Sequence, residues 1–120
     1  MNVTWLNCNG PSNFYKAVDT FTTQKIDIIC LSETWLRSYT KQIPGYKTLQ
    51  VEAVKFKKKG RFCGGQVMLC NESYEPIFLR KCHSWSFICI KSLQLIVGSV
   101  YIKPGDKKED RKENKKIVDR

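Results

Sequence analysis

Three polar side chains fall where predicted strands end. Glu33 follows the run from Ile26 to Leu31, which is rich in β-branched residues and predicts a buried strand. Asn7 closes the first predicted strand, and Tyr101 closes the last. In α/β proteins the strand ends form a sheet rim where ligands and metals bind. Glu33 is therefore a candidate ligand-binding carboxylate; the alternative is a solvated residue that opens a loop.

Basic residues are concentrated in the middle of the chain. The formal net charge is +10, from 21 Lys and Arg against 11 Asp and Glu. Five of the basic residues fall within 55–61: Lys55, Lys57, Lys58, Lys59 and Arg61. Such a concentration of positive charge favours binding to a polyanion, either nucleic acid or an anionic membrane face. The alternative is a lysine-rich surface loop that keeps the protein soluble by charge.

Six cysteines occur without the close pairs that zinc sites use. The last four, Cys63, Cys70, Cys82 and Cys89, are separated by six, eleven and six residues, and His83 adjoins Cys82. Zinc ligands normally include one pair two to four residues apart, and disulfides are typical of exported proteins. The chain begins without a secretory signal, so reduced core thiols are favoured over zinc or disulfides. His83 is interpreted as a turn residue.

The first 31 residues predict a β-α-β unit. Residues 2–8 alternate like a strand, and Asn9-Gly10-Pro11 is a turn. Ser12 is the predicted N-cap of a helix, which has one apolar stripe: Phe14, Ala17, Val18 and Phe21. The strand from Ile26 follows. A crossover of this kind is right-handed and leaves its two strands parallel.

The remainder predicts short strands that pair in antiparallel fashion. They are expected at Tyr46–Val51, Gln66–Cys70, Pro76–Lys81, Trp85–Lys91 and Leu93–Ile102. Twelve of the last fifteen residues are charged, so residues 105–120 are expected to be a frayed helix or disordered, outside a domain at 1–104. No apolar run approaches membrane-spanning length. An intracellular location is expected, nuclear if the protein is functional.

Five segments in series resemble the endonuclease/exonuclease/phosphatase superfamily, most strongly the endonuclease domain of LINE-type (non-LTR) retrotransposons. They are LNCNG, IDIICLSETWL, IPGY, GRFCGGQVMLC and LIVGSVYIKP, within residues 2–104. In that family they read like N-x-N-G, D-I-x-x-L-x-E-T-W-L, I-P-G-Y, G-G-V-x-I-L and V-Y-x-P. The resemblance implies an α/β fold: the N-terminal half of a four-layer α/β sandwich, with one mixed sheet, a β-α-β start and a flanking helix.

The resemblance also implies roles for the three strand-end residues. Glu33 matches the carboxylate that binds catalytic Mg²⁺, and Asn7 matches the amide beside it in the metal and phosphate site. Tyr101 matches the tyrosine that contacts the scissile phosphate. A hard divalent cation, Mg²⁺ or Mn²⁺, prefers oxygen ligands and keeps positions open for water and phosphate. The basic residues at 55–61 would follow the DNA backbone without reading sequence.

The chain departs from the family in its second half. The family supplies a Gly-Asp-x-Asn segment and a terminal Ser-Asp-His, and neither occurs here. Gly105-Asp106 follows the YIKP segment too early to serve. The resemblance therefore implies one wall of a cleft, inactive alone, with weak metal binding. The inner sheet face is expected to lack its partner layer, which favours self-association, completion by a missing second half or limited stability.

Two other functions remain open at this point. The first is a phosphoester hydrolase of the same superfamily with a non-DNA substrate, such as a phosphoinositide or sphingomyelin. The second is a non-catalytic basic module that binds nucleic acid by charge alone. The ETWL and IPGY segments, together with the basic residues, favour DNA as the partner.

Overall fold

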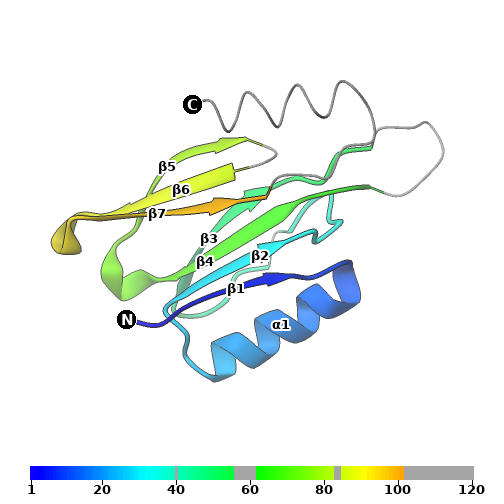
Figure 1. Cartoon of the computed structure of the whole chain (residues 1–120). Coiled ribbons are helices and arrows are strands. Elements are labelled where there is room, and N and C mark those ends of the chain that lie inside the picture. The colour runs from blue at the N-terminus through cyan, green and yellow to red at the C-terminus, as the bar shows by residue number, and fades with distance from the viewer. Residues whose placement is uncertain (40, 56–61, 83–84, 102–120) are drawn as a thin grey trace.

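The structure is a computed structural model, and it describes residues 1–39, 41–55, 62–82 and 85–101 (Figure 1). These residues form seven strands, one α-helix and two 3₁₀ turns, at Glu72–Tyr74 and Lys91–Leu93. The longer elements are β1 (Val3–Asn7), α1 (Pro11–Thr23), β2 (Ile28–Ser32), β3 (Tyr46–Val51), β4 (Gln66–Asn71), β5 (Ile77–Cys82), β6 (Trp85–Ile90) and β7 (Leu95–Val100). The predicted α/β class is confirmed.

The first sheet has the strand order β1-β2-β4-β3 and mixes directions. β1 and β2 run parallel and are joined through α1, which confirms the predicted β-α-β start. β4 runs antiparallel to both of its neighbours, β2 and β3. All five residues of β2 are buried, because the strand lies inside the sheet and both of its faces are covered.

The second sheet was not part of the predicted architecture. β5, β6 and β7 pair antiparallel in that order and pack against the first sheet instead of extending it. Ile88 and Ile90 of β6 are fully buried against Met68 and Cys70 of β4. The expectation that the inner face lacks a partner layer is therefore wrong, since this chain supplies the layer itself.

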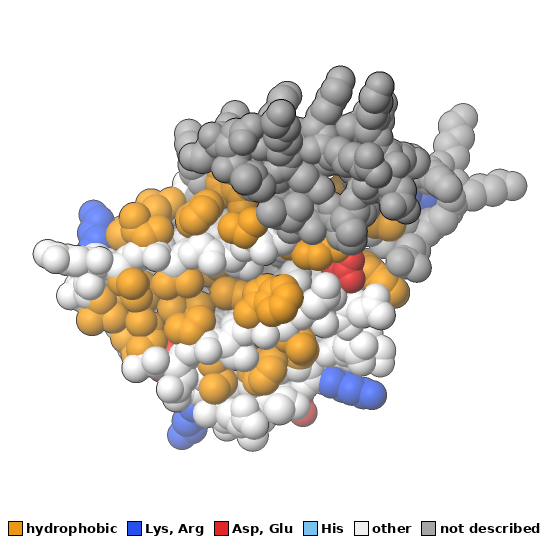
Figure 2. All heavy atoms as spheres, in the orientation of Figure 1, with side chains coloured by type: hydrophobic (Ala, Val, Ile, Leu, Met, Phe, Trp, Pro, Cys, Tyr) orange, Lys and Arg blue, Asp and Glu red, His pale blue; other side chains and the backbone are white. Residues whose placement is uncertain are grey.

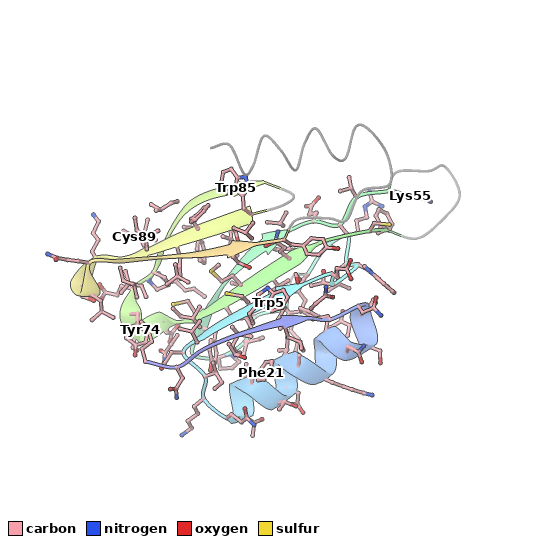
Figure 3. All side chains as sticks on the ribbon, viewed as in Figure 1. Trp5, Phe21, Lys55, Tyr74, Trp85 and Cys89 are labelled. Atoms are coloured by element: carbon pink, nitrogen blue, oxygen red, sulfur yellow. The ribbon has the colours of Figure 1, made fainter. Side chains whose placement is uncertain are left out.

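Two apolar cores lie on opposite faces of the first sheet. Alternate residues of β2 belong to different cores: Ile29 and Leu31 pack with Phe14 and Ala17 of α1, whereas Ile28 and Cys30 face the second sheet. Phe21 of α1, labelled in Figure 3, packs against the first of these cores. The layers are therefore helix, mixed sheet and antiparallel sheet (Figure 1).

The start of α1 differs from the sequence prediction. Gly10, and not Ser12, is the N-cap, and no side chain caps the helix. Gly10 has φ 125° and ψ 167°, a conformation that is almost exclusive to glycine, and Pro11 follows with its φ suited to a first helical turn. The chain therefore begins the helix two residues earlier than a serine cap would place it.

The remaining strands lie within two residues of their predicted bounds and pair antiparallel as expected. Residues 105–120, predicted to be a charged tail, lie outside the described residues, as does His83. Among the described residues, no helix combines the length and apolarity needed to cross a membrane.

The packing of the second sheet on the first is testable through Ile88. Its side chain is fully buried between the sheets, so Ile88→Ala removes core contacts and leaves a cavity. We expect it to lower the free energy of unfolding by about 2–5 kcal/mol. Leu93→Ala is the matched control, since Leu93 is half exposed in the turn before β7, and it should change little. Urea unfolding measures both; equal losses would contradict the packed inner face.

Candidate functional site

The predicted site residues gather at one end of the two sheets. Asn7 ends β1 and pairs with Ser32, the last residue of β2, and Glu33 follows directly. Tyr101 follows β7 in the other sheet. The Tyr101 hydroxyl donates a hydrogen bond to Oε1 of Glu33. Glu33 and Tyr101 are thus in direct contact although they are 68 positions apart in the chain.

A left-handed backbone carries Glu33 out of the sheet. Glu33 has φ 50° and Trp35 has φ 57°, backbone angles that residues other than glycine rarely adopt. Each such residue typically costs about 1–3 kcal/mol, and they persist where surrounding contacts fix the backbone.

Two neighbouring turns hold the loop in place. The Glu33 carbonyl accepts a hydrogen bond from the Gly10 amide at 3.0 Å. On the other side, the Trp35 amide donates to the Gly64 carbonyl at 2.9 Å, and the Thr34 amide donates to the Gly65 carbonyl at 3.3 Å. The loop that carries Glu33 is therefore fixed between the β1–α1 turn and the segment that enters β4.

Close approach of side chains explains why glycines occupy these turns. A Cβ built on Gly10 would lie 2.9 Å from the Trp35 ring, and one on Gly65 would lie 2.6 Å from Oγ1 of Thr34. Thr34 is fully buried, and its Oγ1 accepts a hydrogen bond from the Leu36 amide at 3.3 Å. The residues of the ETW segment thus position Glu33 by packing against glycine backbone.

The Tyr101 phenol stays protonated at neutral pH. Burial raises its pKa above the ordinary value, and the hydrogen bond to Glu33 and the negative charge of that carboxylate raise it further. A neutral phenol can donate, so Tyr101 orients one carboxylate oxygen of Glu33. Among the described residues, no hydrogen bond to the second carboxylate oxygen, Oε2, is seen.

Asn7 lies beside Glu33 on the adjacent strand. The Cys8 amide donates to the Ser32 carbonyl at 2.8 Å, which keeps the end of β1 against the end of β2. The side-chain oxygen of Asn7 accepts a hydrogen bond from the Asn9 amide at 3.2 Å. Asn7 itself is exposed, so its amide group faces solvent at the rim.

Ser32 is a polar residue beside the candidate site that the sequence prediction did not single out. It is fully buried, its Oγ has no hydrogen-bond partner among the described residues, and it stands between Asn7 and Gln66 in a polar row across β1, β2 and β4. A buried hydroxyl without a partner is costly in an apolar layer. The sequence signal was a serine closing an otherwise apolar strand.

The basic segment is described only at its start. Lys55 is exposed, and its Nζ lies 5.9 Å from the centre of the Phe62 ring. The guanidinium carbon of Arg37 lies 6.0 Å from the same ring, a cation that sequence reasoning did not single out. Lys57, Lys58, Lys59 and Arg61 lie outside the described residues.

Five cysteines are free thiols: Cys8, Cys30, Cys63, Cys70 and Cys89. Cys8, Cys30 and Cys70 are buried, and burial raises the pKa of each to about 11, so they are neutral and unreactive. This agrees with the predicted core thiols. Within the described ranges, no three His, Cys, Asp or Glu side chains come together as a metal cluster.

The oxygen atoms at the rim fit a hard divalent cation only sparsely. Glu33 offers a carboxylate and Asn7 an amide oxygen, which is a short set even for Mg²⁺, an ion that keeps several waters. A cation held by these two residues would therefore bind weakly, with most of its positions open to water or phosphate.

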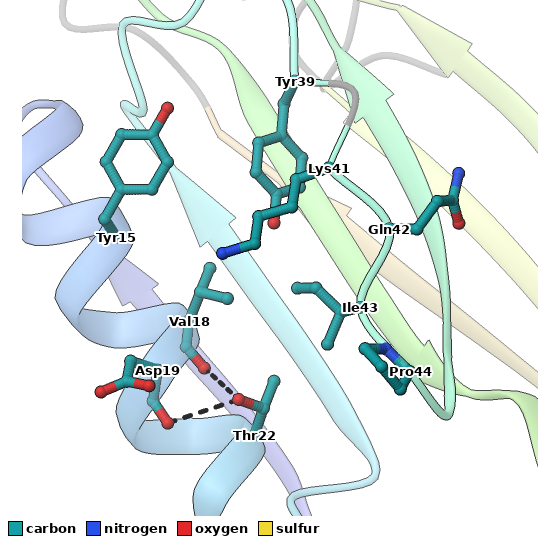
Figure 4. Close-up of a pocket in the computed structure, with 9 residues that line it drawn as sticks. All are labelled: Tyr15, Val18, Asp19, Thr22, Tyr39, Lys41, Gln42, Ile43 and Pro44. Carbon is teal, nitrogen blue, oxygen red and sulfur yellow. Dashed lines mark hydrogen bonds between the residues drawn. The ribbon is translucent and has the colours of Figure 1, made fainter.

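One pocket away from the rim lies on the α1 face of the first sheet. A pocket of about 370 Å³ between α1 and the segment before β3 is lined by Tyr15, Val18, Asp19, Thr22, Tyr39, Lys41, Gln42, Ile43 and Pro44 (Figure 4). None of the three predicted site residues lines it. A smaller groove between β1 and α1 does include Asn7.

A scan of the sequence against protein-family models finds no match, and a search of curated proteins finds no similar one. The interpretation of the rim therefore depends on its own geometry.

The fixed position of the Glu33 loop is testable at Gly10. An alanine there would force a glycine-only conformation and displace the Trp35 ring, so we expect Gly10→Ala to cost more than the 1–2 kcal/mol typical of a left-handed alanine, roughly 2–4 kcal/mol. Gly45→Ala is the control, because Gly45 also has positive φ (86°) but nothing lies within 4 Å of its built Cβ. Thermal or urea unfolding compares them, and equal losses would argue against the Trp35 contact.

Proposed function

We propose that this chain carries part of a metal-dependent phosphodiesterase site of the retrotransposon endonuclease type, with DNA as its substrate. The observation that carries the proposal is the hydrogen bond from Tyr101 to Glu33, with Asn7 on the adjacent strand. The acid and the phenol are in contact, and the amide residue ends the strand next to β2 at the same rim. The resemblance of five sequence segments to that superfamily points to the same three residues.

The chemistry assigned to each residue follows from its groups. Glu33 would hold Mg²⁺ or Mn²⁺ through the oxygen that Tyr101 leaves free, and Asn7 would add a neutral oxygen or an amide donor. When bound, the cation would neutralise charge on a phosphate oxygen. The Tyr101 phenol, kept neutral by its surroundings, is a donor that can reach either the carboxylate or a phosphate oxygen.

DNA is favoured over other phosphoesters by the charge of the chain. Five basic residues fall within 55–61, on the C-terminal side of the ETW segment. The charged groups of Lys55 and Arg37 both lie near the Phe62 ring. Charges of this kind bind the phosphate backbone without reading bases, and they raise the rate of encounter. They would hold a strand of DNA near the rim.

Hydrolysis needs more groups than these 120 residues supply. The family's Asp, Asn and His from the Gly-Asp-x-Asn and Ser-Asp-His segments have no counterpart in the sequence. Loss of members of a catalytic unit typically lowers the rate by several powers of ten. The chain alone is therefore proposed to bind metal and DNA without cleaving DNA above background.

The metal site is tested by titration with Mn²⁺, followed through the relaxation of water protons. We expect weak binding by the wild-type chain and its loss in Glu33→Gln, because the amide removes the carboxylate charge of Glu33 from the rim. Glu72→Gln is the matched control, since Glu72 is exposed in the turn after β4 and should leave binding unchanged. Equal binding by the wild type and Glu33→Gln would refute the metal site.

Plasmid nicking with Mn²⁺ is run alongside, and cleavage that Glu33→Gln abolishes would refute the proposed inactivity.

The role of the basic segment is tested by the salt dependence of DNA binding. Replacing Lys57, Lys58 and Lys59 by Gln removes three charges, so the slope of log K against log salt should become shallower by up to about 3. Glu33→Gln separates the proposal from a module that binds by charge alone, because only a metal-dependent site predicts that Mn²⁺ strengthens binding in the wild type and not in this variant. Filter binding or fluorescence anisotropy with duplex DNA measures both effects.

A further inference from the structure

The two sheets are offset by one strand. β3 and β5 contact each other at one side of the sandwich. At the other side, Leu95 and Val97 of β7 pack against the core that contains Ile28 and Cys30 of β2, whereas Val3 and Trp5 of β1 stay about half exposed, so β7 lies over β2 and not over β1. The four-stranded sheet therefore extends one strand beyond the three-stranded sheet, and β1 has no strand above it among the described residues.

The offset leaves an apolar ledge on β1. Val3 and Trp5 pair with Ile28 and Cys30, which face the second sheet, so their side chains point to the same face. They are nevertheless 54% and 53% exposed. Trp5 is labelled on β1 in Figure 3, and hydrophobic side chains gather over β1 and β7 on the face seen in Figure 2. Exposed apolar surface of this kind marks an interaction site.

The two sides of the sandwich differ in how their edge strands are protected. On the β3–β5 side, β5 has a break in register between Phe78 and Arg80 and carries Arg80 and Lys81, while β3 carries Lys47. Bulges and basic residues are the devices that keep edge strands from pairing. On the other side, β1 (VTWLN) and β7 (LIVGSV) contain no charge and no proline, and β7 pairs with β6 in unbroken register.

We propose that the β1–β7 side is the interface of a homodimer, in which β1 of each copy lies beside β7 of the other. Each copy has one strand that protrudes, β1, and one space a single strand wide, next to β7 and above β1. A second copy, rotated by a two-fold axis parallel to the strands, places its protruding β1 in that space beside β7. By the same rotation, β1 of the first copy fills the corresponding space in the second copy. The surface is therefore complementary to itself, as a two-fold interface requires.

The backbone and the side chains both favour this occupant. Edge strands present rows of N–H and C=O groups without partners, and another strand satisfies them best. Neither strand carries a charge, so no like charges meet in the paired edges despite the net +10 of the chain. Trp5 of each copy would be buried near the two-fold axis, where a large aromatic side chain contributes most to an interface.

The test measures mass by light scattering over a concentration series of the full chain. We expect the wild type to reach twice the 14.0 kDa mass of the chain. Trp5→Lys should raise the dissociation constant by about tenfold or more, since it places charge in the interface. Leu79→Lys, on the β5 edge and similarly exposed at 47%, should leave the dimer intact. A wild type that stays monomeric, or a dimer that Leu79→Lys alone disrupts, overturns the proposal.

Hydrogen exchange on the wild type keeps the proposal testable if Trp5→Lys fails to fold. Backbone amides of β1 and β7 should become faster to exchange on dilution, while those of β3 keep their rate. If the exchange rates of all strands changed equally with protein concentration, or did not change, the assignment of β1 and β7 as the paired edges would be contradicted. Salt gives a second distinction: screening the net +10 should strengthen the dimer, whereas it weakens DNA binding.

Discussion

Burial of β2 on both faces is the constraint on which the arrangement depends. Its five residues alternate between a core shared with α1 and a core shared with the second sheet, so none can carry a charge. An ionised group in either core would cost several kcal/mol unless it were paired. Carboxylates therefore appear only outside the strand, with Asp27 immediately before it and Glu33 immediately after it. The candidate carboxylate therefore lies at the rim, because the apolar interior excludes charged groups.

Backbone geometry positions the Glu33 carboxylate at the rim as much as side-chain contacts do. Glu33 leaves the buried strand in a left-handed conformation, and its loop is fixed by hydrogen bonds from Gly10 on one side and to Gly64 on the other. Tyr101 reaches the carboxylate from the second sheet. The carboxylate is therefore positioned by three separate parts of the chain, and a change in the packing of either sheet would move it.

The side of the sandwich left open by the offset also delivers two of the site residues. Asn7 ends β1 and Tyr101 follows β7, and these are the two uncharged edge strands. Any strand that pairs with these edges would therefore stabilise the segments that carry the amide and the phenol. The same two short strands thus form the open edge and lead into the rim.

The sequence alone determined the local elements and the three candidate residues. The strand predicted at Tyr46–Val51 has the observed bounds of β3, and the end of the buried strand marked Glu33, because residue type and local pattern are properties of short segments. The helix start was wrong by two residues, since Gly10 is required by the approach of the distant Trp35 ring. Only the tertiary structure showed that β5, β6 and β7 form a second sheet, that Ser32 is buried without a partner, and that Tyr101 contacts Glu33. Short amphipathic strands pack equally well beside a sheet or upon it, and the choice depends on contacts between residues far apart in the chain.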